Sequence, residues 1–208
     1  MKIFINNLNE SWVIDRFRAD WYKYNKEIST NKAKDADIIW IISPWTWKKV
    51  KKKYLKQKKV VCSIHHIDFN KFNDEDLKEF YERDQYVDEY HTISIKSKEQ
   101  IETLTDKKIV SIPFWINQEI FFHINNKSKL REEYGFNKND YIIGSFQRDT
   151  EGSDLKSPKL IKGPDVFYEI VEKIYQNDKN LKILLTGKRR QYLISRLKEN
   201  SIPYKYYE

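Results

Sequence analysis

Apolar positions along this chain recur in two alternating patterns, one typical of strands and one typical of helices. The predicted strands are Lys2–Asn6, Asp37–Ile42, Val60–Ile64, Tyr90–Ile93, a last strand within Ile109–Ile124, and then Tyr141–Phe146 and Leu181–Leu185. Between the strands, apolar residues recur at helical spacing, as do Ile14, Phe17, Trp21 and Tyr24. Strands that alternate with helices indicate parallel βα units, so the sequence predicts an α/β fold.

The later helices are predicted from the same spacing and from capping residues. They are Asp74–Arg83, a helix behind a capping box at Ser97–Gln100, Lys129–Tyr134, Asp165–Tyr175 and Gln191–Lys198. In Asp165–Tyr175 the residues expected to be buried are Phe167, Ile170, Val171 and Ile174.

The predicted elements divide the chain into two unequal domains. Residues 1–124 supply enough strands and helices for a complete, doubly wound Rossmann-like domain. Residues 125–208 supply only two strands and their helices, too few to cover both faces of a parallel sheet. We therefore expect an incomplete second Rossmann-like domain at 125–208.

Length and composition narrow the class of protein. The chain has 208 residues, 39% of them hydrophobic, and no apolar run approaches the roughly 20 residues that cross a bilayer. Its N-terminus lacks the apolar core of a secretory signal. The single cysteine, Cys62, lies in an apolar run and cannot form an internal disulfide, which agrees with a reducing compartment. We expect a cytoplasmic protein in which Cys62 is a buried thiol.

The net charge of +8 raises the question of an anionic partner. Lys, Asn, Ile and Tyr are abundant along the whole chain, and their A/T-rich codons explain the charge, so nucleic acid is not favoured. Only Lys48–Lys59 concentrates basic residues, as a predicted helix with Trp47, Val50 and Tyr54 at helical spacing. Two interpretations stay open: a solvated helix face, or peripheral contact with an anionic membrane surface.

A lone arginine follows the apolar strand Tyr141–Phe146, and a lysine and a glycine precede the next predicted helix. Arg148 leaves the carboxyl end of that strand, and Lys162 and Gly163 stand just before the helix that starts near Pro164. The free N–H groups of a helix N-terminus attract anions, and the two cations add to this attraction. An arginine binds two oxygens through its planar fork, whereas a lysine acts as a point charge. We therefore predict a diphosphate-binding site at Arg148, Lys162 and Gly163, suited to a nucleotide-sugar.

A second basic segment follows the strand Leu181–Leu185. Gly187 and Arg189 lie in G-K-R-R, which is not a P-loop because it lacks the upstream glycine and the Ser or Thr after lysine. It opens a helix at the same sheet edge as Arg148, so Gly187 and Arg189 are candidate nucleotide contacts. The alternative is the basic first turn of a surface helix.

Two histidines end the predicted strand Val60–Ile64. Side chains alternate along a strand, so His65 and His66 point to opposite faces and only one is expected to reach a ligand. The alternative is a histidine that is satisfied at a strand end. Cys62, His66 and Asp68 have no further Cys or His pair at ligand spacing, so no metal site is expected.

These motifs resemble a known enzyme family. The segment Gly144–Arg148, followed by Lys162–Asp165 and an amphipathic helix, is similar to retaining glycosyltransferases of the GT-B fold, family four (glycosyl transferases group 1). Further similar segments are Ala36–Ile39, Ser63–His66 and Ile93–Ser94. The resemblance covers most of the chain. It implies an acceptor-side domain at 1–124 and part of a nucleotide-sugar-binding domain at 125–208.

The resemblance also implies the chemistry. Such an enzyme moves a hexosyl group from a nucleotide-diphosphate donor to a glycan or lipid-linked acceptor with retention. Fixed cations in a dry cleft stabilise the leaving diphosphate, so neither metal nor cofactor is expected. His65 and His66 are the candidate catalytic residues, and the resemblance favours His65 for a role beside the donor sugar.

Two departures from the family pattern carry further expectations. Fourteen positions separate Arg148 from Lys162, about twice the family's usual spacing, so residues 149–161 are expected to form an outward loop of turn-forming residues. The family's paired glutamates would lie beyond Glu208, so the isolated chain is expected to be inactive. The alternative function is a non-catalytic basic module that binds nucleic acid or an anionic membrane surface.

Overall fold

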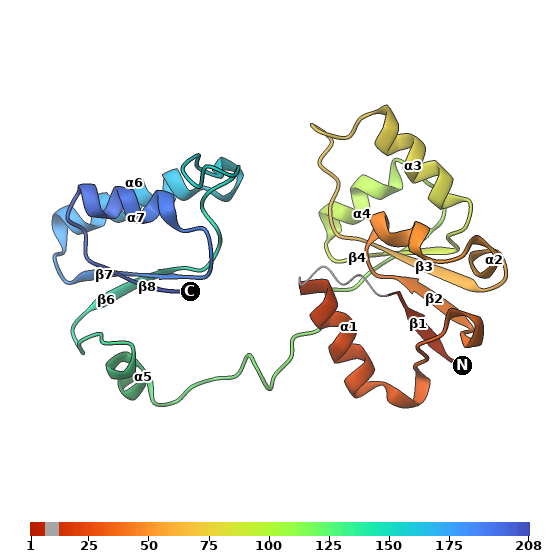
Figure 1. The fold of residues 1–208 in the computed structure, drawn as a ribbon, viewed down its shortest axis with the longest axis horizontal. Helices are drawn as coiled ribbons and strands as arrows, with labels where there is room; N and C mark the ends of the chain where they lie inside the picture. The colour runs from red at the N-terminus through yellow and green to blue at the C-terminus, as the bar shows by residue number, and fades with distance from the viewer. Residues whose placement is uncertain (7–12) are drawn as a thin grey trace. The chain divides into compact units, whose positions relative to one another are not determined.

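The computed structural model describes residues 1–6 and 13–208, and the chain divides into two compact units. The first unit is Met1–Phe122 and the second is His123–Glu208 (Figure 1). The sequence had placed this boundary after residue 124. Each unit has its own parallel sheet and its own hydrophobic core.

The first unit is built on a five-stranded parallel sheet whose strands lie in chain order. They are β1 (Ile3–Ile5), β2 (Ile38–Ile41), β3 (Lys59–Ile64), β4 (Glu89–Thr92) and β5 (Lys108–Ser111). The α-helices are α1 (Val13–Tyr24), α2 (Lys52–Leu55), α3 (Asp74–Asp84) and α4 (Ile95–Glu102). Both faces of the sheet carry buried apolar side chains, as a parallel sheet requires. Cys62 is one of them, as predicted, and burial raises the pKa of its thiol to about 11.

Helix α1 covers one face of this sheet, and the later helices pack on the other (Figure 1). The course of the chain after α1 explains why the helices lie on different faces. Ser29 forms a parallel bridge with Ile3 at the edge of β1 that is opposite β2. The backbone N–H of Thr30 donates to the Ile3 carbonyl at 3.0 Å. The chain therefore winds first to one side of β1 and then crosses to β2 on the other. Right-handed crossovers that run in opposite directions along a sheet place their helices on opposite faces. In such sheets ligands bind at the carboxyl ends of the strands, next to the strand where the crossover direction changes.

The predicted helix over Lys48–Lys59 was wrong. A 3₁₀ segment, Pro44–Lys49, and the single turn α2 replace it, and the extended backbone of Val50 lies between them. Trp47 is 0% exposed and Val50 is 5% exposed, so their spacing reflects packing into the core. The capping box expected at Ser97–Gln100 is also displaced, because Ser94 caps α4 and Ser97 lies inside it.

The second unit holds a three-stranded parallel sheet in the order β6 (Tyr141–Ser145), β7 (Leu181–Thr186) and β8 (Tyr204–Tyr207). Its helices are α5 (Lys127–Glu133), α6 (Pro164–Asn177) and α7 (Gln191–Glu199). The strand β8 was not predicted. Both crossovers run in the same direction, so α6 and α7 share one face of the sheet (Figure 1). On α6 the buried residues include Tyr168 and Val171, whereas Ile170, expected in the core, is 52% exposed.

Of the helices in the described part of the chain, none combines the length and the apolar character that crossing a membrane requires.

Candidate functional site

The carboxyl edge of the first sheet carries the two predicted histidines. His65 is the residue after β3 and is half-buried. Its Nε2 donates to the carbonyl oxygen of Ile42, the residue after β2, at 2.8 Å. Its ring stacks on Phe114 with centroids 5.5 Å apart. Burial lowers the pKa of His65, so the ring is neutral near pH 7. His66 is exposed and lines a pocket of about 310 Å³. Their roles beside a donor sugar stay predictions.

A third histidine, which the sequence analysis did not single out, lies next to them. Nε2 of His91 donates to the Ile112 carbonyl at 2.7 Å, so its Nδ1 accepts from Ser63 Oγ at 2.8 Å. Ser63 Oγ in turn accepts from the indole N–H of Trp40 at 2.8 Å. When His91 is neutral, each N–H and O–H group in this chain of hydrogen bonds donates to an acceptor. Burial lowers the pKa of His91, which favours this neutral form.

This arrangement predicts a pH-dependent stability. The pKa values of His65 and His91 are lowered from the ordinary 6.5, so the unfolded chain takes up protons before the folded chain does. The free energy of unfolding is expected to be constant above about pH 7.5 and to fall as the pH drops through 6.5. Urea unfolding at pH 7.5 and pH 5.5 measures the difference. His91→Gln should reduce the difference, and an unchanged pH dependence in that variant would contradict this role.

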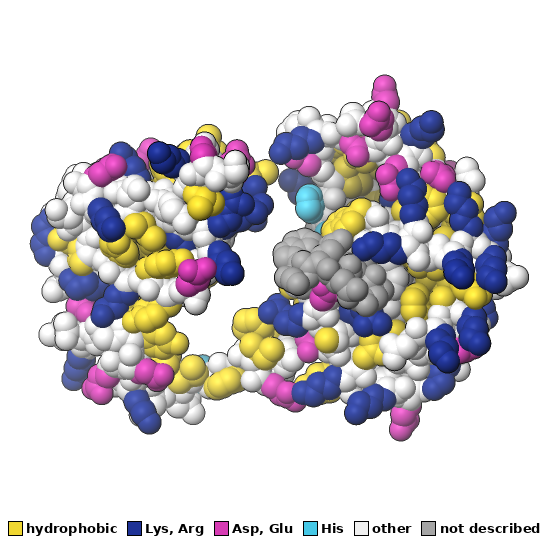
Figure 2. Space-filling model, viewed as in Figure 1, with side chains coloured by type: hydrophobic (Ala, Val, Ile, Leu, Met, Phe, Trp, Pro, Cys, Tyr) yellow, Lys and Arg dark blue, Asp and Glu magenta, His cyan; other side chains and the backbone are white. Residues whose placement is uncertain are grey.

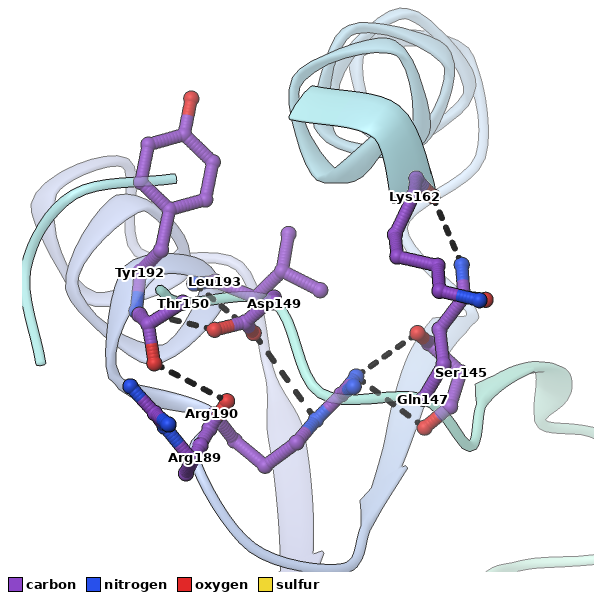
Figure 3. Close-up of polar contacts among 9 residues, drawn as sticks. All are labelled: Ser145, Gln147, Asp149, Thr150, Lys162, Arg189, Arg190, Tyr192 and Leu193. Carbon is purple, nitrogen blue, oxygen red and sulfur yellow. Dashed lines mark hydrogen bonds and ion pairs between the residues drawn. The ribbon is translucent and has the colours of Figure 1, made fainter. Parts of the chain in front are cut away.

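The second unit brings Lys162 back to the end of β6. Residues 151–157 form an excursion that closes on itself, since Thr150 pairs with Pro158 in an antiparallel bridge and Lys159 N donates to the Asp149 carbonyl at 2.8 Å. Nε2 of Gln147 then donates to the Lys162 carbonyl at 2.7 Å (Figure 3). Part of the outward loop predicted from the spacing is therefore present. Arg148 comes directly after Gln147, and its side chain and that of Lys162 are exposed.

Gly163 allows the chain to turn from this loop into α6. Its φ is +61°, in the left-handed region, and it is the N-cap residue of the helix, with Pro164 next to it. The Gly163 N–H donates to the Leu160 carbonyl at 2.8 Å and Pro164 has no N–H, so the first N–H of α6 is that of Asp165, three residues after Lys162. The structure places Arg148, Lys162 and Gly163 at the same sheet edge, and their binding of a diphosphate stays a prediction.

An ion pair that the sequence analysis missed holds this loop in place (Figure 3). Arg190 is fully buried, and its guanidinium donates to the carbonyl and to Oγ of Ser145 at 3.1 and 2.7 Å. Its Nε lies 3.8 Å from Oδ2 of Asp149. The same carboxylate accepts from the backbone N–H groups of Tyr192 and Leu193 in the first turn of α7, both at 3.3 Å. These contacts fix residues on both sides of Arg148.

The other candidate nucleotide contacts have structural partners. The Arg189 carbonyl accepts from Asp149 N at 3.0 Å and from Thr150 Oγ1 at 3.4 Å, and its guanidinium donates to the Gly152 carbonyl. Arg189 has a φ of +63° and Gly187 a φ of +78°, which form a tight turn after β7. Arg189 therefore ties the 151–157 excursion to this turn, and contact of Gly187 and Arg189 with a nucleotide stays a prediction.

Three lysines of the basic segment Lys48–Lys59 form ion pairs with acidic side chains. Lys48 and Lys52 lie within 4.0 Å of carboxylate oxygens of α3, and Lys59 pairs with Glu89 at 2.7 Å. The apolar residues Trp47 and Val50 are buried, so a peripheral membrane contact there is not supported. On the face that Figure 2 shows, Lys and Arg side chains are spread over both units with Asp and Glu among them.

No group of three or more His, Cys, Asp or Glu side chains in the described residues has an arrangement that would hold a metal ion. The expectation of a reaction without metal or cofactor rests on the sequence argument alone.

Comparison with known proteins supports the fold. No protein-family model matches the chain, and no curated protein sequence matches it. Among solved structures, HepE of Anabaena, in complex with UDP and glucose, is 14% identical at a TM-score of 0.63, covering 100% of this chain and 70% of its own. TarM is 17% identical, with a TM-score of 0.55 over 90% of this chain and 35% of its own.

A third solved structure belongs to a UDP-forming α,α-trehalose-phosphate synthase from Burkholderia xenovorans. It is 15% identical, with a TM-score of 0.51, covering 94% of this chain and 52% of its own. The chain thus spans about half of that protein and about a third of TarM. Together with the parallel sheets of five and three strands, these likenesses show that the chain has the α/β, Rossmann-like fold of GT-B glycosyltransferases.

Proposed function

We propose that this chain is a glycosyltransferase, or a part of one, that binds a nucleoside-diphosphate sugar at the carboxyl edge of the second sheet. The observation that carries the proposal is the return of Lys162 and the start of α6 to the end of β6, where Arg148 is exposed. Two cations and a helix N-terminus at one edge suit a diphosphate. The likeness to HepE, which was crystallised with UDP and glucose, supports the same ligand class.

The chemistry follows from the charges involved. Breaking the bond between a sugar and its diphosphate builds negative charge on the leaving group, which fixed cations stabilise in a site that excludes water. In this proposal Arg148 and Lys162 hold the diphosphate. His65 or His66 is the catalytic residue, a glycan or lipid-linked molecule is the acceptor, and the configuration is retained. No metal takes part, and the protein works in the cytoplasm.

Calorimetric titration of the intact 208-residue chain tests the proposal. UDP, GDP and their monophosphates are titrated with and without EDTA. We expect one diphosphate to bind at least about tenfold more tightly than its monophosphate, because the second phosphate adds charge-assisted hydrogen bonds. EDTA should not change the affinity. Failure of both diphosphates to bind at millimolar concentration would contradict the proposal, and loss of binding in EDTA would contradict its metal-free form.

A further inference from the structure

Among the described residues, one buried arginine of the first unit has no counterion. Arg83 lies in the last turn of α3 and is 6% exposed. Within the described residues its guanidinium makes no hydrogen bond and no ion pair, and Nε is buried without a partner. Its Cζ lies 5.1 Å from the centroid of the Phe80 ring, a cation–π contact. An arginine stays charged, and an unpaired buried charge is costly unless a ligand compensates it.

The two acidic neighbours of Arg83 in sequence are engaged elsewhere. Glu82 forms an ion pair with Lys52 at 3.1 Å. Asp84 accepts from the hydroxyl groups of Tyr90 and Thr105 at 2.8 and 3.1 Å and forms an ion pair with Lys107 at 3.6 Å. Neither carboxylate forms an ion pair with Arg83.

Arg83 lines the pocket of about 310 Å³ at the carboxyl end of β3, on which His66 also lies. The three acids on its wall already have partners on the protein. Asp68 accepts from Asn70 N, Asp76 accepts from Asn73 N in a capping box, and Glu79 accepts from the Trp47 indole N–H with Lys48 at 3.6 Å. The basic groups differ, since within the described residues the side chains of Lys71, His66 and Arg83 make no hydrogen bond and no ion pair. Lys71 and His66 are exposed to water, so Arg83 is the buried charge of this pocket that lacks an opposite charge.

The remaining wall is apolar and suits a sugar ring. Trp45, Ile67 and Phe72 line the pocket beside the basic groups. Aromatic and aliphatic walls with a few placed polar groups are typical of small-molecule sites of this volume. A guanidinium that lines such a pocket favours a carboxylate or a phosphate, because its fork binds two oxygens at once.

We propose that this pocket binds an anionic saccharide, with Arg83 as the counterion of its carboxylate or phosphate group and Lys71 and His66 at the rim. That this saccharide is the acceptor rests on the proposed function. The binding itself does not, because every residue of the pocket belongs to the first unit.

Titration of the whole chain with three monosaccharides tests the inference. Glucuronate carries a carboxylate, glucose 6-phosphate carries a phosphate, and methyl glucoside is neutral. We expect at least one of the two anions to bind about tenfold or more tightly than methyl glucoside. Equal affinity for all three, or no binding of either anion at millimolar concentration, would overturn the inference. So would preferential binding of the cationic sugar glucosamine, which the wall carboxylates would favour.

Variants separate a binding role from a structural one. Arg83→Met removes the charge and leaves an unbranched apolar side chain beside Phe80, so it should lose the anion preference while its melting temperature is equal or higher. Lys71→Gln, at the exposed rim, should weaken anion binding several-fold without affecting folding. Lys56→Gln removes one positive charge from the same unit outside the pocket and should change nothing. Unchanged anion binding in both pocket variants would refute the proposal even if UDP binds, whereas loss of UDP binding alone would refute only the proposed function.

Discussion

Replacing Arg148 with alanine is expected to weaken the binding of a nucleoside diphosphate by about 100-fold. A bidentate, charge-assisted contact to phosphate contributes on the order of 3 kcal/mol, and 1.4 kcal/mol is a factor of ten in affinity. Arg148 is exposed at the end of β6, so the alanine variant should fold normally. Calorimetric titration with the diphosphate that binds the wild-type chain measures the change.

Two variants make this result specific. Arg148→Lys keeps the charge and loses the fork, so its affinity should lie between those of the wild type and the alanine variant. Lys156→Ala removes an exposed charge from the 151–157 excursion a few residues away and should bind as the wild type does. If Arg148→Ala binds the diphosphate as tightly as the wild type, Arg148 has no part in the site.

Local patterns in the sequence were enough to predict the βα order and part of the outward loop. Residues such as Gly152 and Pro158 favour turns, so the sequence indicated a loop over 149–161. In the structure the chain already returns to Asp149 at Lys159. The short edge strand β8 was missed because it has only four residues, in which Tyr204 and Tyr206 on either side of Lys205 are too few positions for a strand pattern to be recognised. The strand β8 is stabilised by pairing with β7, a contact between residues distant in sequence that the pattern of neighbouring residues does not predict.

The errors around charged residues have a common cause. The segment Lys48–Lys59 has helical spacing at Trp47 and Val50, yet a 3₁₀ turn and an extended residue bury both side chains equally well. Arg83 and Arg190 carry no mark in the sequence that separates them from exposed arginines. Their burial follows from packing between elements that are distant in the chain, such as Arg190 against Ser145. Burial of a charge is therefore the feature of the candidate sites that sequence reasoning was least able to find.

Loss of Arg190 is expected to destabilise the second unit by about 3–5 kcal/mol, because it leaves the buried carboxylate of Asp149 without its cation. Burial already raises the pKa of Asp149, and Arg190 opposes that shift, so Arg190→Met should raise the pKa further. When the pKa of a carboxyl group is higher in the folded than in the unfolded state, the folded state is favoured at low pH. The free energy of unfolding then falls as the pH rises towards that pKa. The free energy of unfolding that Arg190→Met loses relative to the wild type should therefore be larger at pH 7.5 than at pH 5.

Urea unfolding of the wild type and Arg190→Met at these two pH values measures the effect. Adding Asp149→Asn to Arg190→Met removes the buried charge and keeps one of the two oxygens, which accept separately from Tyr192 N and Leu193 N. The double variant should therefore recover part of the lost stability at pH 7.5 and lose the extra pH dependence. Because Asp149 follows Arg148, restored stability with weak nucleotide binding would show that the ion pair also orients Arg148. A deficit of Arg190→Met that is equal at both pH values would instead mean that lost packing, and not the unpaired Asp149 carboxylate, causes the destabilisation.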